Sequence, residues 1–201
     1  NGNKDTVIAT VDAGVHTIRF IKDTQAGKNR NNYNNIVALS FFGELLESDA
    51  VILRCEGLDT IANILINGEL AGGAWNMHRI WEFDVKSLLH EGENTIEVHF
   101  LSPTKYIKEA YAKSVADGSS DAMVGFPHLR KAHCMFGWDW GPRLPDAGIW
   151  RDIMILGVDV ARIRDVHVLQ HHEENKVTLE VHTHINKVTG TAPVAVTVTA
   201  P

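Results

Sequence analysis

Cysteine is scarce in this sequence. Only Cys55 and Cys134 occur among 201 residues, which excludes a disulfide scaffold but leaves one bridge between the two open. Cys55 ends an apolar run over residues 51–55, a setting typical of a small buried side chain. This usage favours a reducing, cytoplasmic compartment.

Long apolar runs and excess positive charge are also missing. No apolar stretch approaches the roughly 20 residues needed to cross a bilayer. Residues 1–5 are polar and include neither a Met nor a signal-peptide core, which predicts a cut or processed chain. Acidic residues outnumber basic ones 25 to 19, for a net charge of −6. We therefore expect neither a membrane nor nucleic acid as a partner, and the absence of a Gly-rich phosphate loop predicts no cofactor.

What the sequence does contain is a series of short strand patterns. Strands are predicted at residues 36–42, 50–55, 61–66, 95–101 and 151–158. Asn67-Gly68 predicts a type I′ hairpin turn, because both residues tolerate positive φ. Ser102-Pro103 predicts the start of a helix that runs to about Val115, with the serine as N-cap. The Asn-rich residues 28–35 predict an exposed loop. The fold class is therefore all-β with a short helix.

Residues 159–201 form a separate unit in this interpretation. Residues 165–171 and 177–185 predict a hairpin in which Glu173 pairs with Lys176, Val168 faces Val181 and His167 faces His182. A third strand is predicted at residues 194–199. Three strands are too few for a sandwich, which normally has about seven. We interpret this part as the incomplete start of a second β-sandwich.

Five titratable side chains share one face of that hairpin in the predicted register. They are Asp165, His167, His171, His182 and His184. Imidazoles at these spacings could bind zinc. A solvated polar face opposite a Val/Leu face explains the same alternation without a metal. Because no closed set of four ligands is evident, we expect no metal site.

The most informative motif is Gly-Trp-Asp-Trp-Gly-Pro at residues 137–142. A carboxylate accepts hydrogen bonds from sugar hydroxyls, and an indole gives a flat apolar wall against a pyranose ring. Alternatively, both tryptophans are core anchors and Asp139 caps a turn. The motif lies within residues 118–150, which show no regular period and hold three of the five tryptophans. Such a long loop is usually functional or disordered, and its aromatic content argues against disorder.

His133 and Cys134 precede the motif and raise the possibility of a nucleophile pair. Adjacent residues on an extended chain point to opposite sides. We therefore expect no catalytic residue among them.

Residues 136–150, Phe-Gly-Trp-Asp-Trp-Gly-Pro-Arg-Leu-Pro-Asp-Ala-Gly-Ile-Trp, closely resemble the signature of β-mannosidases in glycoside hydrolase family two. Further stretches agree: Gly-Leu-Asp-Thr at 57–60 with residues 64–68, Asn-Met-His-Arg at 76–79 with Phe-Asp-Val at 83–85, and Gly-Glu-Asn at 92–94. The resemblance covers about residues 50–158 well and 160–185 loosely. Residues 1–35 match poorly, with only Gly14-Val15-His16 faintly similar.

The resemblance implies a jelly-roll β-sandwich, a sugar-binding domain, at residues 1–158, followed by the start of an immunoglobulin-like β-sandwich at 159–201. The parent enzyme would be a retaining exo-β-mannosidase that hydrolyses terminal β-mannose. Its catalytic glutamates would lie on a (β/α)₈ domain of the same chain. The family's acid/base glutamate follows an asparagine, and no Asn-Glu dipeptide occurs here. We therefore expect this piece to be inactive alone.

The same resemblance implies roles for four residues. Trp138 and Asp139 would line the subsite for the non-reducing mannose, and Trp140 and Arg143 would support the loop. The expected partner is a β-mannoside or a manno-oligosaccharide. Two alternatives stay open: a free-standing lectin-like module, and a structural β-domain whose tryptophans all belong to the core.

Overall fold

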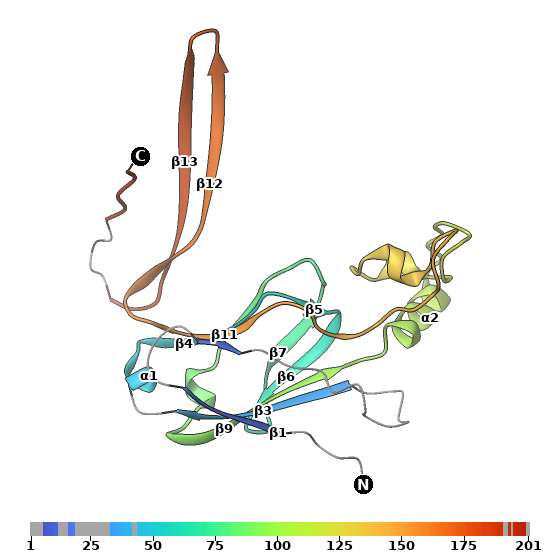
Figure 1. The fold of residues 1–201 in the computed structure, drawn as a ribbon, viewed down its shortest axis with the longest axis horizontal. Helices are drawn as coiled ribbons and strands as arrows, with labels where there is room; N and C mark the ends of the chain where they lie inside the picture. Colours follow the sequence, from blue (N-terminus) through green and yellow to red (C-terminus); the bar gives the residue numbers. More distant parts are fainter. Residues whose placement is uncertain are drawn as a thin grey trace.

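Two β-sheets packed face to face form the body of the molecule (Figure 1). The computed structural model describes residues 6–11, 16–18, 33–41, 44–190, 193 and 195–199. One sheet has the order β1 (Thr6–Val11), β3 (Tyr33–Phe41), β9 (Gly92–Phe100), β6 (Ile61–Ile66) and β7 (Glu69–Trp75). The other has the order β2 (His16–Ile18), β11 (Ile153–Val158), β4 (Ala50–Cys55) and β8 (Trp81–Asp84). This arrangement confirms the predicted all-β sandwich.

The pairing is antiparallel throughout the described strands, apart from the parallel pair of β1 and β3. The short strands β5 (Leu58–Asp59) and β10 (Gly148–Ile149) form a separate two-stranded pair. Strands β1 and β2 lie in the first 35 residues, where the sequence pattern predicted no strand. The predicted loop at 28–35 was partly wrong, because Tyr33 begins β3; residues 28–32 lie outside the described residues.

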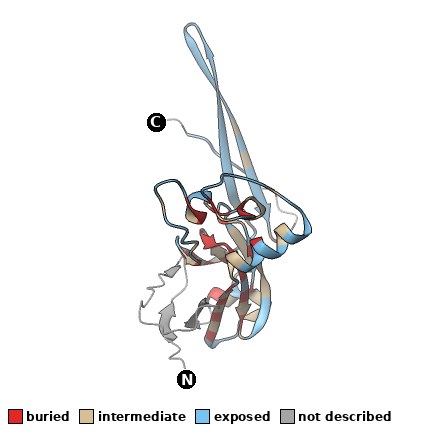
Figure 2. Cartoon of the chain, turned by 90° about the vertical axis from the view of Figure 1, so that its right-hand side faces the viewer, coloured by how far each residue is buried: buried red, intermediate tan, exposed pale blue. Residues whose placement is uncertain are grey.

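Alternating apolar side chains from the two sheets meet in one core. In β9, Ile96, Val98 and Phe100 are each at most 1% exposed, as the alternation predicted. Leu53 and Cys55 of β4 contribute from the opposite sheet, and both are fully buried. Buried residues accordingly line the interface between the two layers in Figure 2.

A buried amide network fixes one end of the sandwich. Asn67 and Gly68 have φ angles of 52° and 83°, which confirms the predicted type I′ turn. The side chain of Asn67 donates to Leu88 O and to Asn94 Oδ1, both at 2.8 Å. Asn94 is fully buried and donates in turn to His90 O at 2.7 Å. The two amides therefore join the turn between β6 and β7 to the start of β9.

The main helix follows β9, as predicted. Helix α2 (Pro103–Lys113) begins after Ser102, whose hydroxyl accepts the backbone N–H of Lys105 at 3.3 Å. The shorter helical segments are α1 (Glu44–Glu47), η1 (Lys86–Leu88), η2 (Phe126–His128) and η3 (His133–Phe136).

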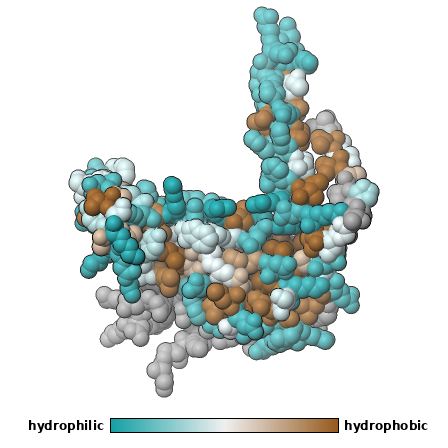
Figure 3. Space-filling view, turned by 180° about the vertical axis from the view of Figure 1, so that it is seen from behind, coloured by the Kyte–Doolittle hydropathy of each residue, from teal (hydrophilic) through white to brown (hydrophobic). Residues whose placement is uncertain are grey.

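A long two-stranded hairpin, β12 (Ala161–Glu173) and β13 (Lys176–Lys187), rises from the end of the sandwich opposite α2 (Figure 1). Its register is the predicted one, with Glu173 opposite Lys176 and Val168 opposite Val181. Val166 and Leu179 are 52% and 58% exposed, so the apolar face is open, and brown side chains mark it in Figure 3. The predicted third strand was wrong for residues 195–199, where the structure describes no strand, since β12 and β13 pair only with each other.

Two carboxylates fasten this hairpin to the sandwich. Asp49 accepts the backbone N–H of Val160 at 2.8 Å and the hydroxyl of Thr189 at 2.6 Å. Glu82 binds Arg54 at 2.8 Å and also Arg162 at the base of β12. The hydrogen bond from Thr189, then that from Val160, lowers the pKa of Asp49. Partial burial acts to raise the pKa of Glu82, but the hydrogen bonds and charges of Arg162 and Arg54 outweigh it and lower the pKa overall.

These lowered pKa values predict that the contacts of Asp49 and Glu82 at the base of the hairpin, here called the joint, are sensitive to acid. A carboxylate whose pKa is lower in the folded state stabilises that state above its unfolded pKa, and this contribution is lost as the pH falls through the folded pKa. We expect the joint to be intact above about pH 5 and to loosen below about pH 4. An NMR titration of the Val160 amide should report the change. The Asp49→Asn variant should show no such transition at Val160; an unchanged Val160 amide between about pH 5 and 2.5 in the unmodified protein would contradict the assignment.

The amide network predicts a stability effect. The Asn94→Ala variant removes both the acceptor of Asn67 and the donor to His90 O, leaving buried polar groups without partners. We expect a loss of about 1–3 kcal/mol in the free energy of unfolding, measured by urea denaturation. Asn63→Ala, on the exposed side of β6, is the matched control and should change stability by less than about 0.5 kcal/mol.

Candidate functional site

The Trp-Asp loop, residues 118–150, connects the region of α2 to β11 and has a small core of its own. Its members are Ile107, Ala122, Phe126, Leu129 and Phe136, all at most 8% exposed. Ile107 comes from α2 and the others come from the loop. The backbone N–H of Met123 also donates to Phe136 O at 3.0 Å. The loop therefore lacks long regular elements, as its sequence predicted, yet it is packed.

A buried ion pair joins this loop to the sandwich. The ammonium group of Lys131 binds the carboxylate of Asp59 in β5 and donates to Asp146 O at 2.8 Å. The side chains of Lys131 and Asp59 are 0% and 6% exposed. Sequence reasoning missed Lys131, because lysine is almost never fully buried unless it is paired and no local pattern marks this one. The only available signal was Asp59, within the Gly-Leu-Asp-Thr stretch.

A second contact joins the loop to the turn before β8. The backbone N–H of Met77 donates to Arg130 O at 2.8 Å, and Asn76 forms a bridge with Arg130. Ala132 N–H approaches the sulfur of Met77 at 3.4 Å. The residues on both sides of Lys131 are therefore held against the sandwich.

The motif itself forms a tight turn. Gly141 N–H donates to Trp138 O at 3.1 Å, and Trp138 N–H donates to Gly141 O at 3.4 Å, which leaves Asp139 and Trp140 at the tip. Gly137 precedes the turn with a φ of 119°, and a Cβ there would lie 2.7 Å from both Asp121 O and Arg143 Cγ. Only glycine fits that position without displacement.

The tip of the turn is open to solvent. Trp138 and Trp140 are 46% and 81% exposed, and Asp139 is also exposed. The two indole rings lie edge to face with their centroids 5.5 Å apart. Within this chain neither Trp138 nor Trp140 is a core anchor, so the interpretation of these two side chains as core residues was wrong.

Arg143 lies behind the turn. Its Nε donates to Asp121 O at 3.0 Å, and its Nη2 donates to Ser120 O at 3.3 Å. The guanidinium thereby links the segment that follows the turn to the first part of the loop. This geometry stabilises the base of the turn and leaves the tip free.

The three tryptophans outside the motif lie near the end of the sandwich to which the Trp-Asp loop is attached. Trp81 pairs with Cys55 at the end of β4, and its ring centroid is 4.6 Å from that of Trp75. Trp150 N–H donates to Gly57 O at 3.0 Å, just beyond β4. Trp138 and Trp140 belong to the loop that Lys131 ties to β5. Trp75 and Trp150 are 59% and 45% exposed, so this end presents an aromatic surface.

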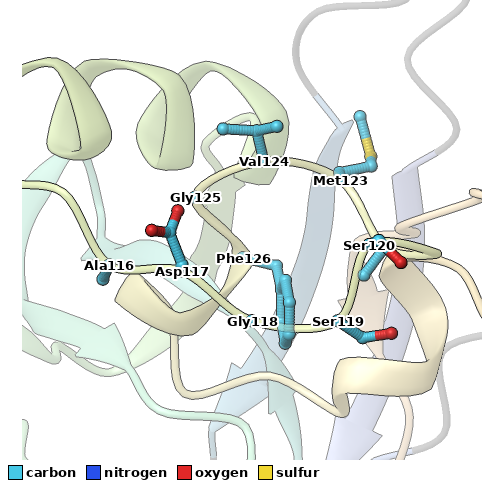
Figure 4. A pocket seen from close by; sticks show the side chains of 10 residues that line it. Ala116, Asp117, Gly118, Ser119, Ser120, Met123, Val124, Gly125 and Phe126 are labelled. Atoms are coloured by element: carbon cyan, nitrogen blue, oxygen red, sulfur yellow. The ribbon is translucent and has the colours of Figure 1, made fainter.

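A pocket of about 140 Å³ lies in the first part of the loop (Figure 4). It is lined by residues 116–120 and 122–126, including the carboxylate of Asp117 and the ring of Phe126. Tyr111 donates to Asp117 at 3.2 Å, and this hydrogen bond raises the pKa of Tyr111. The pocket adjoins the segment that Arg143 holds.

The cysteines and the histidines of the hairpin were the other candidates for chemistry. Cys55 and Cys134 are both free thiols, and burial raises the pKa of Cys55 to about 12. On the hairpin, His171 and His182 both contact Glu180, at 3.1 and 2.7 Å, while His184 contacts Asp165 at 2.5 Å. In the part of the chain that the structure describes, no three His, Cys, Asp or Glu side chains converge to hold a metal. The helices described there are too short or too polar to span a membrane.

Comparison with known proteins places these features in a family. The family described as "Glycosyl hydrolase 2 galactose-binding domain-like" matches residues 6–151. A β-mannosidase from Capra hircus is 31% identical over 188 residues, which cover 81% of this chain and 21% of the goat protein. β-Mannosidase B from Aspergillus terreus is 37% identical over 123 residues, which cover 58% of this chain and 14% of the fungal protein.

A solved structure agrees with these sequence matches. The β-D-mannosidase from Dictyoglomus thermophilum superposes with a TM-score of 0.72 and 35% identity, over 78% of this chain and 19% of that protein. The matched part of this chain thus spans between 14% and 21% of the length of these relatives. Because the family match covers most of the sandwich and the Trp-Asp loop, the chain belongs to the galactose-binding-like domains of glycoside hydrolase family two, with β-mannosidases among its homologues.

Proposed function

We propose that this chain is the non-catalytic N-terminal part of a retaining exo-β-mannosidase, which removes terminal β-mannose. In this proposal, the Trp-Asp loop supplies one wall of the sugar site. A (β/α)₈ domain of the same protein supplies the catalytic glutamates and the remaining walls. The β-mannosidase homologues support the activity. The exposed Trp138–Gly141 turn supports the role of the loop.

The observation that carries this proposal is the open carboxylate at the tip of the turn. Asp139 stands between two exposed indoles on a turn whose base is held by Arg143. A carboxylate at such a position can accept hydrogen bonds from two adjacent ring hydroxyls. The Trp138 ring can cover an apolar face of the sugar. Arg143 supports the base of the turn, and Trp140 supports the Trp138 ring through their edge-to-face contact.

The site is incomplete in this chain, which is why we assign the rest to another domain. Small-molecule sites usually enclose about 300–1,000 Å³ and bury most of the ligand. The pocket in the first part of the loop has only about 140 Å³, and the motif is open to solvent. The aromatic end of the sandwich is a suitable surface for the second domain, since Trp75 and Trp150 are exposed beside the loop.

We also propose that residues 159–201 begin an immunoglobulin-like β-sandwich. The hairpin of β12 and β13 has one apolar face, including Val166, Val168 and Leu179, and a polar face bearing four histidines. An antiparallel sheet with this alternation normally packs its apolar face against a second sheet.

The role of Asp139 can be tested in the full-length protein. We expect Asp139→Asn to lower kcat/KM on an aryl β-mannoside by roughly 10- to 150-fold. That range corresponds to about 1.5–3 kcal/mol for one charged hydrogen bond. The melting temperature should stay nearly unchanged, because the side chain is exposed. Glu109 has an exposed carboxylate on α2. The control variant Glu109→Gln should change neither kcat/KM nor the melting temperature. Normal activity in the Asp139→Asn enzyme would refute the proposal.

A binding experiment separates the proposal from a free-standing lectin-like module. Calorimetric titration of residues 1–201 with mannose and with mannobiose should give no measurable binding, because most sugar contacts would come from the absent domain. The same chain should not hydrolyse an aryl β-mannoside. Specific binding with a Kd below about 1 mM would favour the lectin-like alternative instead.

A further inference from the structure

We propose that Lys131 is a positioning residue for the sugar site. Its buried ammonium group, held between the Asp59 carboxylate and the Asp146 carbonyl, fixes the base of the segment that carries Trp138 and Asp139. The expected effect of Lys131 on activity rests on the proposed function. The expected effect of Lys131 on the position of the loop rests on the structure alone.

The first argument is topological. The hydrogen bond from Lys131 Nζ to Asp146 O joins two residues that are 15 positions apart. The segment that it closes contains η3, Gly137 and the exposed turn. The motif thus occupies the middle of a chain segment whose two ends meet at one ammonium group. Opening that contact would free both ends of the segment together.

The second argument concerns what the ammonium group is attached to. Asp59 belongs to β5, and its backbone pairs with Gly148 of β10, immediately after the closed segment. Thr60 donates its hydroxyl to the same carboxylate. The base of the segment is therefore fixed to β5 in two ways: by the ion pair between Lys131 and Asp59, and by the backbone pairing of Asp59 with Gly148.

The third argument is energetic. The ion pair is shielded from water, with side chains 0% and 6% exposed. Removing one partner would leave an uncompensated buried charge, so the pair resists separation far more than an exposed ion pair. By contrast, the contacts of Arg143 lie at the surface. Lys131 thus holds the loop more firmly than the surface contacts of Arg143 do.

Such rigidity matters for an acidic residue that must meet sugar hydroxyls. Binding groups need to be held within about 0.5 Å of the productive geometry by the residues behind them. A displacement of about 1 Å at a reacting site can cost on the order of 100-fold in rate. The tip of this turn is open to solvent, so the orientation of the turn is set by the contacts at its base.

The test uses the full-length protein and a paired substitution. In the variant Asp59→Leu with Lys131→Met, both charges are removed together, which avoids an unpaired buried charge and should preserve folding. The hydrogen bond to Asp146 O is lost. We expect amide exchange over residues 133–147 to accelerate by about tenfold or more while the strands β6 and β9 stay protected. We also expect kcat/KM on an aryl β-mannoside to fall roughly 10- to 100-fold at an unchanged melting temperature.

Lys105→Met, which removes an exposed lysine of α2 paired only loosely with Glu109 at 3.9 Å, is the control and should alter neither measurement. If the paired variant does not fold, Asp59→Asn with Lys131→Gln removes both charges while it keeps a neutral polar side chain at each position, and the same exchange measurement then tests the proposal. Unchanged exchange over 133–147 in whichever folded variant is measured would overturn the proposal. The Asp139→Asn enzyme separates the two ideas: its normal activity would refute the sugar site, whereas unchanged loop exchange refutes the role of Lys131.

Discussion

The arrangement of this domain depends on one buried charge pair between Lys131 and Asp59. Without it, the Trp-Asp loop would be attached to the sandwich by backbone contacts, by packing of its small core against Ile61 of β6, and by its two chain connections. A buried lysine normally costs more free energy than it returns, unless its charge is matched and its protons are bonded. Here the Asp59 carboxylate matches the charge, and this carboxylate and the Asp146 carbonyl accept two of the three ammonium protons. The loop consequently has a defined position although most of it is irregular.

Polar side chains fix both ends of the sandwich, while apolar contacts fill its middle. At one end, Lys131 holds the Trp-Asp loop. At the other, Asp49 and Glu82 hold the root of the hairpin. Apolar packing is non-directional, whereas hydrogen bonds and ion pairs specify angles. The Trp-Asp loop and the hairpin project from opposite ends in Figure 1. Their orientation is therefore set by hydrogen bonds and ion pairs, which are directional.

Local patterns in the sequence predicted much of the fold. The alternation before Phe100, the Asn67-Gly68 turn, the Ser102 cap and the hairpin register are set by neighbours in the chain, and each is present. Lys131 and Asn94 could not be predicted in this way, because their burial depends on partners that the fold brings from distant positions. The strands β1 and β2 were missed for a different reason, because their residues lack a clear alternation of apolar and polar side chains. For the candidate site, the residues of the Trp-Asp motif were evident from the sequence, whereas the support beneath them was not.

The paired indoles have an optical consequence. Trp138 and Trp140 lie edge to face with centroids 5.5 Å apart, and Trp75 and Trp81 lie similarly at 4.6 Å. Chromophores at such separations couple their electronic transitions, and the sign and strength of the resulting circular dichroism depend on their mutual orientation. The end of the molecule that presents its aromatic surface therefore carries its own spectroscopic reporters, so docking of a further domain or a saccharide there can be followed without any attached label.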